Sequence, residues 1–246
     1  MEIIIADYSG FCFGVKNAVE KTEETLKSNI NTIATGDLIH NPQEVNRLKG
    51  LGFKIENNPT LTHKEANIII RSHGETLENI EKYKELGYNV IDCTCPVLLS
   101  IYKRIQKYEE EGYKIVIIGK KEHPEIIAMA GHLKKEPIII NSADEAKKVD
   151  GLDKLYIISQ TTNIYEKFFE LSDIIEDSNT NVVIKNTICN ATKNRQRATI
   201  ELAKTVDAMV VIGGRTSSNT NKLFELSKTG CIHTCLDNWG GCSSNG

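Results

Sequence analysis

The chain has 246 residues, with 30 Lys and Arg against 33 Asp and Glu and a formal net charge of −3. This balance, without a basic stripe of interleaved aromatic residues, gives no basis for nucleic-acid binding. Apolar runs are far too short to cross a membrane, and the start MEIIIADYSG lacks the positive flank and apolar core of a signal peptide. We therefore expect a cytoplasmic protein whose seven cysteines bind metal, react or are buried, rather than forming disulfides.

Short β-branched runs alternate with helical patterns along the whole chain. Strands are predicted at 2–6, 32–34, 68–70, 89–91, 114–118, 137–140, 155–158, 182–184 and 208–212. Helices are predicted at 15–27, 43–49, 77–86, 96–110, 125–131, 164–176, 194–205 and 220–228. This alternation predicts an α/β fold with parallel sheets and helical crossovers. The end GCIHTCLDNWGGCSSNG is rich in Gly, Ser and Cys and shows neither pattern.

Three cysteines, Cys12, Cys95 and Cys189, recur at equivalent places, each after a predicted strand and before a helix. A glycine follows each of them 24 residues later, and a polar side chain follows 28 residues later. These positions are Gly36, Gly119 and Gly213, then His40, His123 and Ser217. Such a shared spacing predicts internal repetition.

The repeat divides the chain into three α/β units, which we place at 14–95, at 96–193, and at 1–13 together with 194–246. The first two units share one more element, in which a polar loop follows a strand and precedes a helix. It carries His73 in the first unit and Thr161 in the second. No equivalent is evident before residue 246, so we expect the third unit to be incomplete.

Polar residues at the carboxyl ends of parallel strands lie where open α/β sheets bind ligands. Three such edges facing one another would form a central site surrounded by helix N-termini, which favour anions. The chain has no Walker motif, no GxGxxG and no CxxC knuckle. Three cysteines without a fourth suit an iron–sulfur cluster with one open iron, and zinc on three cysteines stays a possibility.

Each candidate residue also has an ordinary structural interpretation. A lone intracellular cysteine is most often a small buried side chain, and we give that role to Cys93, Cys231, Cys235 and Cys242. His40, His73 and His123 stand at strand exits and are predicted to share a ligand, whereas His63, His132 and His233 are interpreted as surface or hydrogen-bonded residues. Glu125 is a candidate proton donor, although an acid is also common in the first turn of a helix.

The motifs GFCFGV, IHNPQEV, RSHGE, DCTCP, GKKEHPE, SQTT, ICNATKNRQ and GGRTSSNTNKL occur in this order over about residues 1–235. In these motifs the chain resembles the 4-hydroxy-3-methylbut-2-enyl diphosphate reductase (LytB) family, whose members complete the methylerythritol phosphate route to isoprenoids. The resemblance implies a cloverleaf of three α/β units around a central [4Fe-4S] cluster, with Cys12, Cys95 and Cys189 as its ligands.

The resemblance further implies a monomer that takes two electrons from reduced ferredoxin or flavodoxin and two protons, one of them from Glu125. Its allylic diphosphate substrate would lose water and become isopentenyl and dimethylallyl diphosphate. The residues implied in substrate binding are His40, His73, His123, Thr161, Ser217, Ser218 and Asn219.

The match fades near Cys235, where family members continue with another strand and an Ala-Ser loop. We therefore expect a less stable enzyme that is weaker than a complete relative. The alternatives are an inactive member of the family, which binds a cluster or zinc without turnover, and a zinc-dependent hydrolase that uses the cysteines and Glu125.

Overall fold

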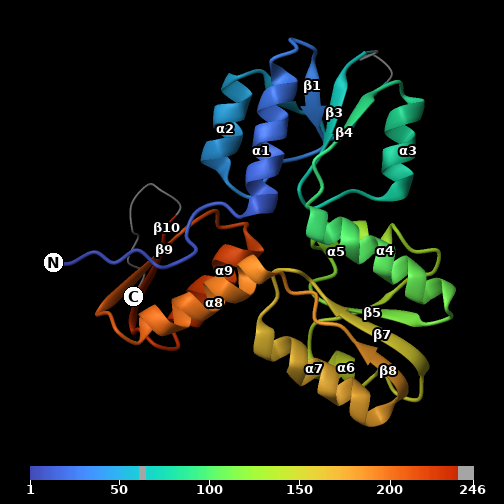
Figure 1. Ribbon diagram of the computed structural model, residues 1–246, viewed down its shortest axis with the longest axis vertical. Coiled ribbons are helices and arrows are strands. Elements are labelled where there is room, and N and C mark those ends of the chain that lie inside the picture. Colours follow the sequence, from blue (N-terminus) through green and yellow to red (C-terminus); the bar gives the residue numbers. More distant parts are fainter. Residues whose placement is uncertain (61–64, 238–246) are drawn as a thin grey trace.

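The computed structural model describes residues 1–60 and 65–237, which form three lobes, each with its own parallel sheet (Figure 1). The sheet of the first lobe has the strand order β2-β1-β3-β4. Helices cover its two faces, over separate apolar clusters. The elements of this lobe are α1 (Phe13–Leu26), β1 (Thr32–Ala34), α2 (Pro42–Gly50), β2 (Phe53–Ile55), β3 (Asn67–Ile70), α3 (Leu77–Glu85) and β4 (Asn89–Asp92).

The second lobe repeats this plan, with the strand order β6-β5-β7-β8. Alternate residues of β5 and β7 point to opposite faces, so that α4 and α5 cover one face and α6 and α7 the other. Its elements are α4 (Pro96–Glu110), β5 (Lys114–Ile118), α5 (Pro124–Ala130), β6 (Ile138–Ile140), α6 (Ala143–Ala146), β7 (Asp153–Ser159), α7 (Tyr165–Ser178) and β8 (Thr180–Ile184).

The third lobe has a smaller sheet, in which the described residues form only two parallel strands, β9 and β10. Its elements are α8 (Asn190–Ala203), β9 (Ala208–Ile212), α9 (Ser218–Ser227) and β10 (His233–Asp237). The last strand corrects the prediction that the end of the chain has no regular structure. Cys235 on β10 is disulfide-bonded, so the expectation that no cysteine would be paired is wrong for this residue.

The predicted strand at 2–6 does not form, and Ile3 and Ile5 are 78% and 77% exposed. In the first two lobes, the strand before the cysteine pairs with the preceding strand of its sheet, β4 with β3 and β8 with β7. The segment 2–6 leads into Cys12 in the same way. However, the described part of the third lobe contains no counterpart of β3 or β7. Without that partner its backbone groups have no ladder to join, and the segment stays irregular.

The chain passes from one lobe to the next at each of the three repeated cysteines (Figure 1). Cys95 separates β4 of the first lobe from α4 of the second, and Cys189 separates β8 from α8 of the third. Cys12 links the N-terminal segment to α1. The guanidinium of Arg195 on α8 donates hydrogen bonds to the carbonyls of Tyr8 and Gly10, at 2.9 and 2.5 Å, and so holds this segment on the third lobe.

The division into three units drawn from the sequence, with its boundaries, stays a prediction. Within the described residues, no helix combines the length and the apolar character that a membrane span requires. His63 and Cys242, both interpreted above, lie outside the described residues.

Candidate active site

The three repeated cysteines occupy the same structural position, the residue that precedes the first turn of a helix: α1, α4 and α8, respectively. All three are free and half-buried. Burial raises the pKa of the Cys95 thiol, and charges on Cys12 and Cys189 raise it further. The three thiols therefore lie close enough together to interact electrostatically, although they come from residues far apart in the sequence. Cys93 is instead fully buried in the core of the first lobe.

Helix α1 packs closely against the Cys95 thiol. A Cβ added to Gly14, on α1, would lie 2.7 Å from Cys95 Sγ, so only glycine allows this approach. Within the described residues, no group of His, Cys, Asp and Glu is spaced to hold a single metal ion. A [4Fe-4S] cluster separates its ligands more widely, because each thiolate binds a different iron. Three free thiols at one junction are a donor set that iron–sulfur clusters use.

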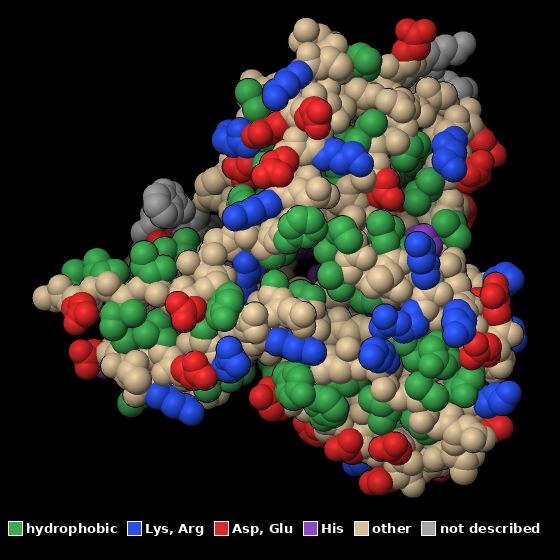
Figure 2. All heavy atoms as spheres, in the orientation of Figure 1, with side chains coloured by type: hydrophobic (Ala, Val, Ile, Leu, Met, Phe, Trp, Pro, Cys, Tyr) green, Lys and Arg blue, Asp and Glu red, His purple; other side chains and the backbone are tan. Residues whose placement is uncertain are grey.

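Three histidines from two lobes meet beside this junction. The ring of His40 lies 4.4 Å from that of His73 and 6.2 Å from that of His123, and the latter two are 6.1 Å apart. His40 Nε2 and His73 Nδ1 are buried without a hydrogen-bond partner in the described structure. Figure 2 shows a hollow between the three lobes with histidine visible inside it. Unpartnered buried nitrogens facing a shared space indicate that a polar ligand completes the site.

Burial keeps these imidazoles neutral. It lowers the pKa of His123 to about 4, with nearby His40, Lys222 and Lys120 adding to the effect. The pKa of His73 lies well below its ordinary value. Burial is the main cause, and positive charge on His40, Arg71 and His123 disfavours a proton on His73 further. The pKa of His40 is also lowered, mainly by burial. At neutral pH each ring therefore has one N–H to donate, and an incoming anion would favour protonation of all three.

Glu125 lies behind the histidines, in the first turn of α5, and is only 5% exposed. His123 precedes this helix, and its Nδ1 accepts the Glu125 amide at 3.2 Å. The Glu125 carboxylate accepts both the amide and the hydroxyl of Thr161, each at 2.6 Å. Burial raises the pKa of Glu125, although these bonds and the charge of Lys222 oppose the shift. The site therefore contains a carboxyl group that keeps its proton to higher pH than an exposed glutamate.

The chain was compared with known protein families. The family model described as LytB protein matches residues 3–237. The chain belongs to the LytB family.

Similar relatives carry one name. A 4-hydroxy-3-methylbut-2-enyl diphosphate reductase from Caldanaerobacter subterraneus subsp. tengcongensis is 39% identical over 238 residues, which are 95% of this chain and 83% of that protein. The enzyme of that name from Helicobacter pylori strain P12 is 38% identical, over 96% of this chain and 85% of its own length. The Clostridium tetani enzyme is 44% identical over 95% of this chain, which is 37% of that longer protein.

Solved structures agree with the LytB assignment. A structure of (E)-4-hydroxy-3-methyl-but-2-enyl diphosphate reductase, described as the terminal enzyme of the non-mevalonate pathway, is 40% identical with a TM-score of 0.75. It is matched over 95% of this chain and 84% of its own. The Plasmodium falciparum E-1-hydroxy-2-methyl-but-2-enyl-4-diphosphate reductase is 26% identical with a TM-score of 0.87, over 93% of this chain and 74% of its own. The resemblance inferred from the motifs is thus confirmed, as is the α/β fold with parallel sheets.

In this LytB protein, the predicted Ser218 belongs to a hydroxyl network between the second and third lobes. Ser218 Oγ accepts hydrogen bonds from Gln160 Nε2 and from the Thr162 hydroxyl, both at 3.2 Å. Ser217 caps α9 by accepting the Thr220 amide at 3.2 Å. Asn219 is half-buried in the first turn of that helix. Thr161, in contrast, already uses its hydroxyl on Glu125.

Lys222 was not among the predicted site residues, yet it lies in the site of this LytB protein. Burial lowers its pKa to about 8, against the opposing effect of the nearby Glu125 carboxylate. Its Nζ donates to Asn163 Oδ1 at 3.3 Å. Lys222 follows Ser218 by one helical turn on α9, so the two share a face. That spacing was readable in GGRTSSNTNKL, whereas its proximity to Glu125, from another lobe, was not.

His132 behaves as the sequence suggested. Its ring stacks on Tyr102 at 3.7 Å, and its Nε2 contacts the Glu75 carbonyl at 3.1 Å. Tyr102 itself lies near both halves of the site, since Glu125 and Cys95 each raise the pKa of its buried hydroxyl, which burial raises most. Tyr102 is therefore a neighbour of both Glu125 and Cys95.

Proposed function

We propose that this chain reductively dehydroxylates (E)-4-hydroxy-3-methylbut-2-enyl diphosphate to isopentenyl and dimethylallyl diphosphate. The observation that supports this most strongly is the meeting of Cys12, Cys95 and Cys189 beside a buried carboxyl group and three neutral histidines. Relatives that match more than four-fifths of their own length bear this enzyme's name. Their names favour the reductase over the inactive alternative.

Cys12, Cys95 and Cys189 would hold one [4Fe-4S] cluster. When bound, the cluster would supply electrons one at a time and offer an iron without a protein ligand to the substrate's hydroxyl. The chain's own contribution is to bring together three thiols from three lobes. In this proposal it supplies no fourth ligand, so the substrate can bind in that position.

His40, His73 and His123 would bind the diphosphate. Their nitrogens, two of them buried and unpartnered, can donate to phosphate oxygens. Lys222 would add a positive charge, and the Ser218 hydroxyl a further hydrogen bond. Thr161 would act through Glu125, and Ser217 and Asn219 would set the start of α9 against the anion.

Glu125 would hold the proton that leaves with the substrate's oxygen. Hydroxide is a poor leaving group, and protonation lets it depart as water, which lowers the barrier. The raised pKa of this carboxyl keeps the proton available, and the two bonds from Thr161 stabilise the carboxylate after transfer. We also propose reduced ferredoxin or flavodoxin as the electron donor, a monomeric state and a cytoplasmic location.

The proposal is tested by reconstituting the protein anaerobically and measuring iron, acid-labile sulfide and zinc in the same sample. We expect about four iron and four sulfide per chain, and turnover of the allylic diphosphate with reduced methyl viologen. Zinc without sulfide would contradict the cluster. A full cluster without turnover would favour the inactive alternative.

A further inference from the structure

A second basic feature lies outside the site, in a surface cleft of about 480 Å³ between α4 and β8 in the second lobe. Lys103, Arg104 and Lys107 on α4 form one wall, and Lys185, just after β8, stands on the other. No acidic side chain is among the residues that line this cleft. We call it the basic cleft.

The fold explains why the cleft is open. Helices α4 and α5 cover β5 and β7, but the edge strand β8 has only its partly buried Val183 under that helical layer. Tyr156 on β7 forms the floor and stacks on Tyr108 of α4 at 3.8 Å. Burial raises the pKa of the Tyr156 hydroxyl to about 12, while the nearby Arg104 guanidinium lowers it. The cleft thus combines a flat aromatic floor with a cationic rim.

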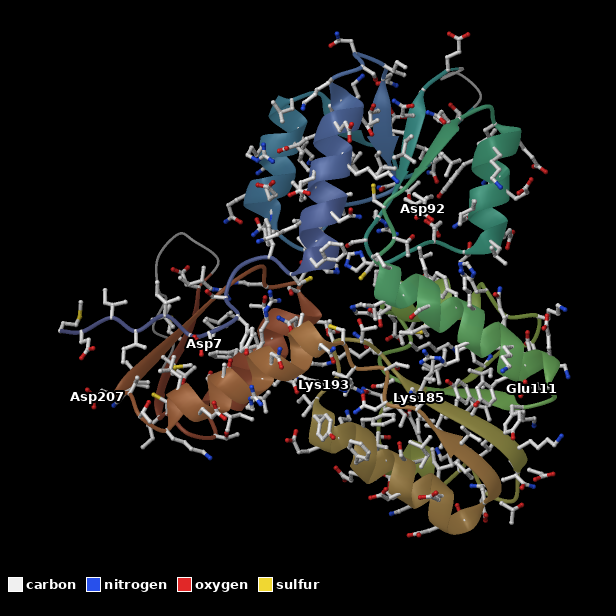
Figure 3. All side chains as sticks on the ribbon, in the orientation of Figure 1. Asp7, Asp92, Glu111, Lys185, Lys193 and Asp207 are labelled. Carbon is white, nitrogen blue, oxygen red and sulfur yellow. The ribbon has the colours of Figure 1, made fainter. Side chains whose placement is uncertain are left out.

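The charges of the rim are largely uncompensated. Within residues 1–60 and 65–237, Lys107 pairs with Glu111 at 3.7 Å, and no ion pair is formed by Lys103, Arg104 or Lys185. Lys and Arg side chains gather over α4 and β8 on the face seen in Figure 2. In Figure 3, Lys185 lies between this region and the centre of the molecule, and Glu111 lies at the far end of α4.

Each wall of the cleft belongs to a segment that adjoins one of the three cysteines in the sequence. Helix α4 begins immediately after Cys95, and Ser100, at the inner end of the cleft, lies five residues further on, a rise of about 7.5 Å. On the other wall, Lys185 precedes Cys189 by four residues. The rim cations of α4 lie eight to twelve residues beyond Cys95, about 12–18 Å along the helix, and so outside the space enclosed by the histidines.

We propose that the basic cleft docks an acidic one-electron carrier protein next to the three cysteines. This inference rests on the proposed function, which needs two electrons and two protons for each substrate molecule and releases its hydroxyl as water. Two reduced carriers would each be oxidised by one electron per turnover. A rim of unpaired cations steers a negatively charged protein by long-range attraction, and redox encounters of this kind use small, transient interfaces.

The test compares a charge-reversal variant with a matched control. K103E/K185E reverses two exposed charges of the rim. K147E/K148E reverses two exposed charges at α6, which covers the opposite face of the same sheet. The cluster-loaded proteins are titrated with an oxidised acidic bacterial ferredoxin at low salt, by calorimetry, and turnover is then measured with that ferredoxin reduced and separately with reduced methyl viologen.

For K103E/K185E we expect an increase of about tenfold in Kd and a matching fall in kcat/KM for ferredoxin, both shrinking as salt is added. Viologen-driven turnover and the behaviour of K147E/K148E should stay at the wild-type level. Unchanged ferredoxin binding in K103E/K185E would overturn the docking proposal, as would an equal loss in the control pair. Absence of viologen-driven turnover in the wild-type protein would instead contradict the proposed function, while the binding experiment would still test the cleft.

Discussion

The Glu125 carboxylate accepts two hydrogen bonds from Thr161, one from the amide and one from the hydroxyl, each at 2.6 Å. The two residues come from different strand exits of the same sheet, so the loop after β7 fixes the carboxylate that begins α5. Burial raises the pKa of Glu125 while Thr161 lowers it. Thr161 therefore lowers the proton affinity of the proposed donor against the effect of burial, and its hydroxyl can be changed separately.

Replacing the donor itself gives the first prediction. E125Q keeps the size of the side chain but removes the transferable proton, so we expect kcat to fall by about 10²- to 10⁴-fold. Iron and sulfide content should stay unchanged, because Glu125 is not proposed as a ligand. E122Q, at an exposed position three residues away, is the control and should retain activity. Equal activity of E125Q and the wild type would exclude Glu125 as the proton donor.

The second prediction concerns T161V, which removes the hydroxyl but keeps the backbone amide. The lost hydrogen bond favoured the ionised carboxylate, so the pKa of Glu125 should rise further. Because the protonated form is the active one, the falling limb of the pH–rate profile should move to higher pH. T161S restores a hydroxyl and should bring the limb back. A profile unchanged in T161V would show that the hydroxyl does not control this proton.

The third prediction concerns stability at low pH. The pKa of His123 is about 4 in the folded protein and 6.5 ordinarily, so between these values the unfolded chain binds more protons. Stability is therefore complete above pH 6.5 and falls as the pH drops towards 4. H123N keeps an acceptor for the Glu125 amide without titrating. Urea unfolding at pH 7 and pH 5 should show a loss smaller by about 1–2 kcal/mol in H123N.

The His123 experiment has its own control in H132N. Burial lowers the pKa of His132 too, but its ring lies outside the histidine cluster, stacked on Tyr102. Substrate diphosphate should raise the apparent pKa of the clustered histidines and reduce the acid sensitivity of the wild type, but not that of H123N by the same amount. An H123N protein as acid-sensitive as the wild type would contradict the prediction.

The fourth prediction separates the two cysteines of the DCTCP motif. C95A should lose cluster iron and sulfide, whereas C93A should keep both. Cys93 is fully buried in the apolar core of the first lobe, where its side chain packs against that core. C93A should instead lower the free energy of unfolding by about 1 kcal/mol, because it leaves a small cavity. Loss of iron in C93A with normal folding would reverse this assignment.

The fifth prediction uses Gly14. A Cβ at this position would lie 2.7 Å from Cys95 Sγ, so G14A should displace the thiol and reduce the iron bound per chain. The crowding should also lower stability by about 1–3 kcal/mol. G50A is the matched control, since an added Cβ there meets nothing within 4 Å. Gly50 ends α2, and its substitution should leave iron content unchanged.

The repeat made much of this architecture predictable. Because Cys12, Cys95 and Cys189 share a spacing, the sequence alone indicated that each would precede a helix at an equivalent place, which the structure confirms. Sequence could not predict that 2–6 remains irregular, because strand formation depends on a partner elsewhere in the chain. The strands β2 and β10 were missed because short edge strands carry little periodic signal.

The site was predictable in its residues but not in its contacts. His40, His73 and His123 were recognised from their strand exits, but the approach of His123, from the second lobe, to the two histidines of the first lobe could not be read from the sequence. Lys222 and Gln160 escaped notice because each resembles an ordinary helix or loop residue until its neighbours from another lobe are known. The shift in Lys222's pKa likewise depends on burial that no local pattern records.

One cysteine lies at each point where the chain crosses from one lobe to the next. A group bound by all three thiolates would therefore link the three lobes to one another. Such a cross-link stabilises the folded arrangement in proportion to how tightly the group is bound, since the unfolded chain does not bring the thiols together. Oxidative loss of the group would remove this cross-link and leave the lobes joined by weaker contacts, such as the hydrogen bonds from Gln160 and Thr162 to Ser218. Chemical damage at the centre would therefore lower the stability of the whole fold as well as its activity.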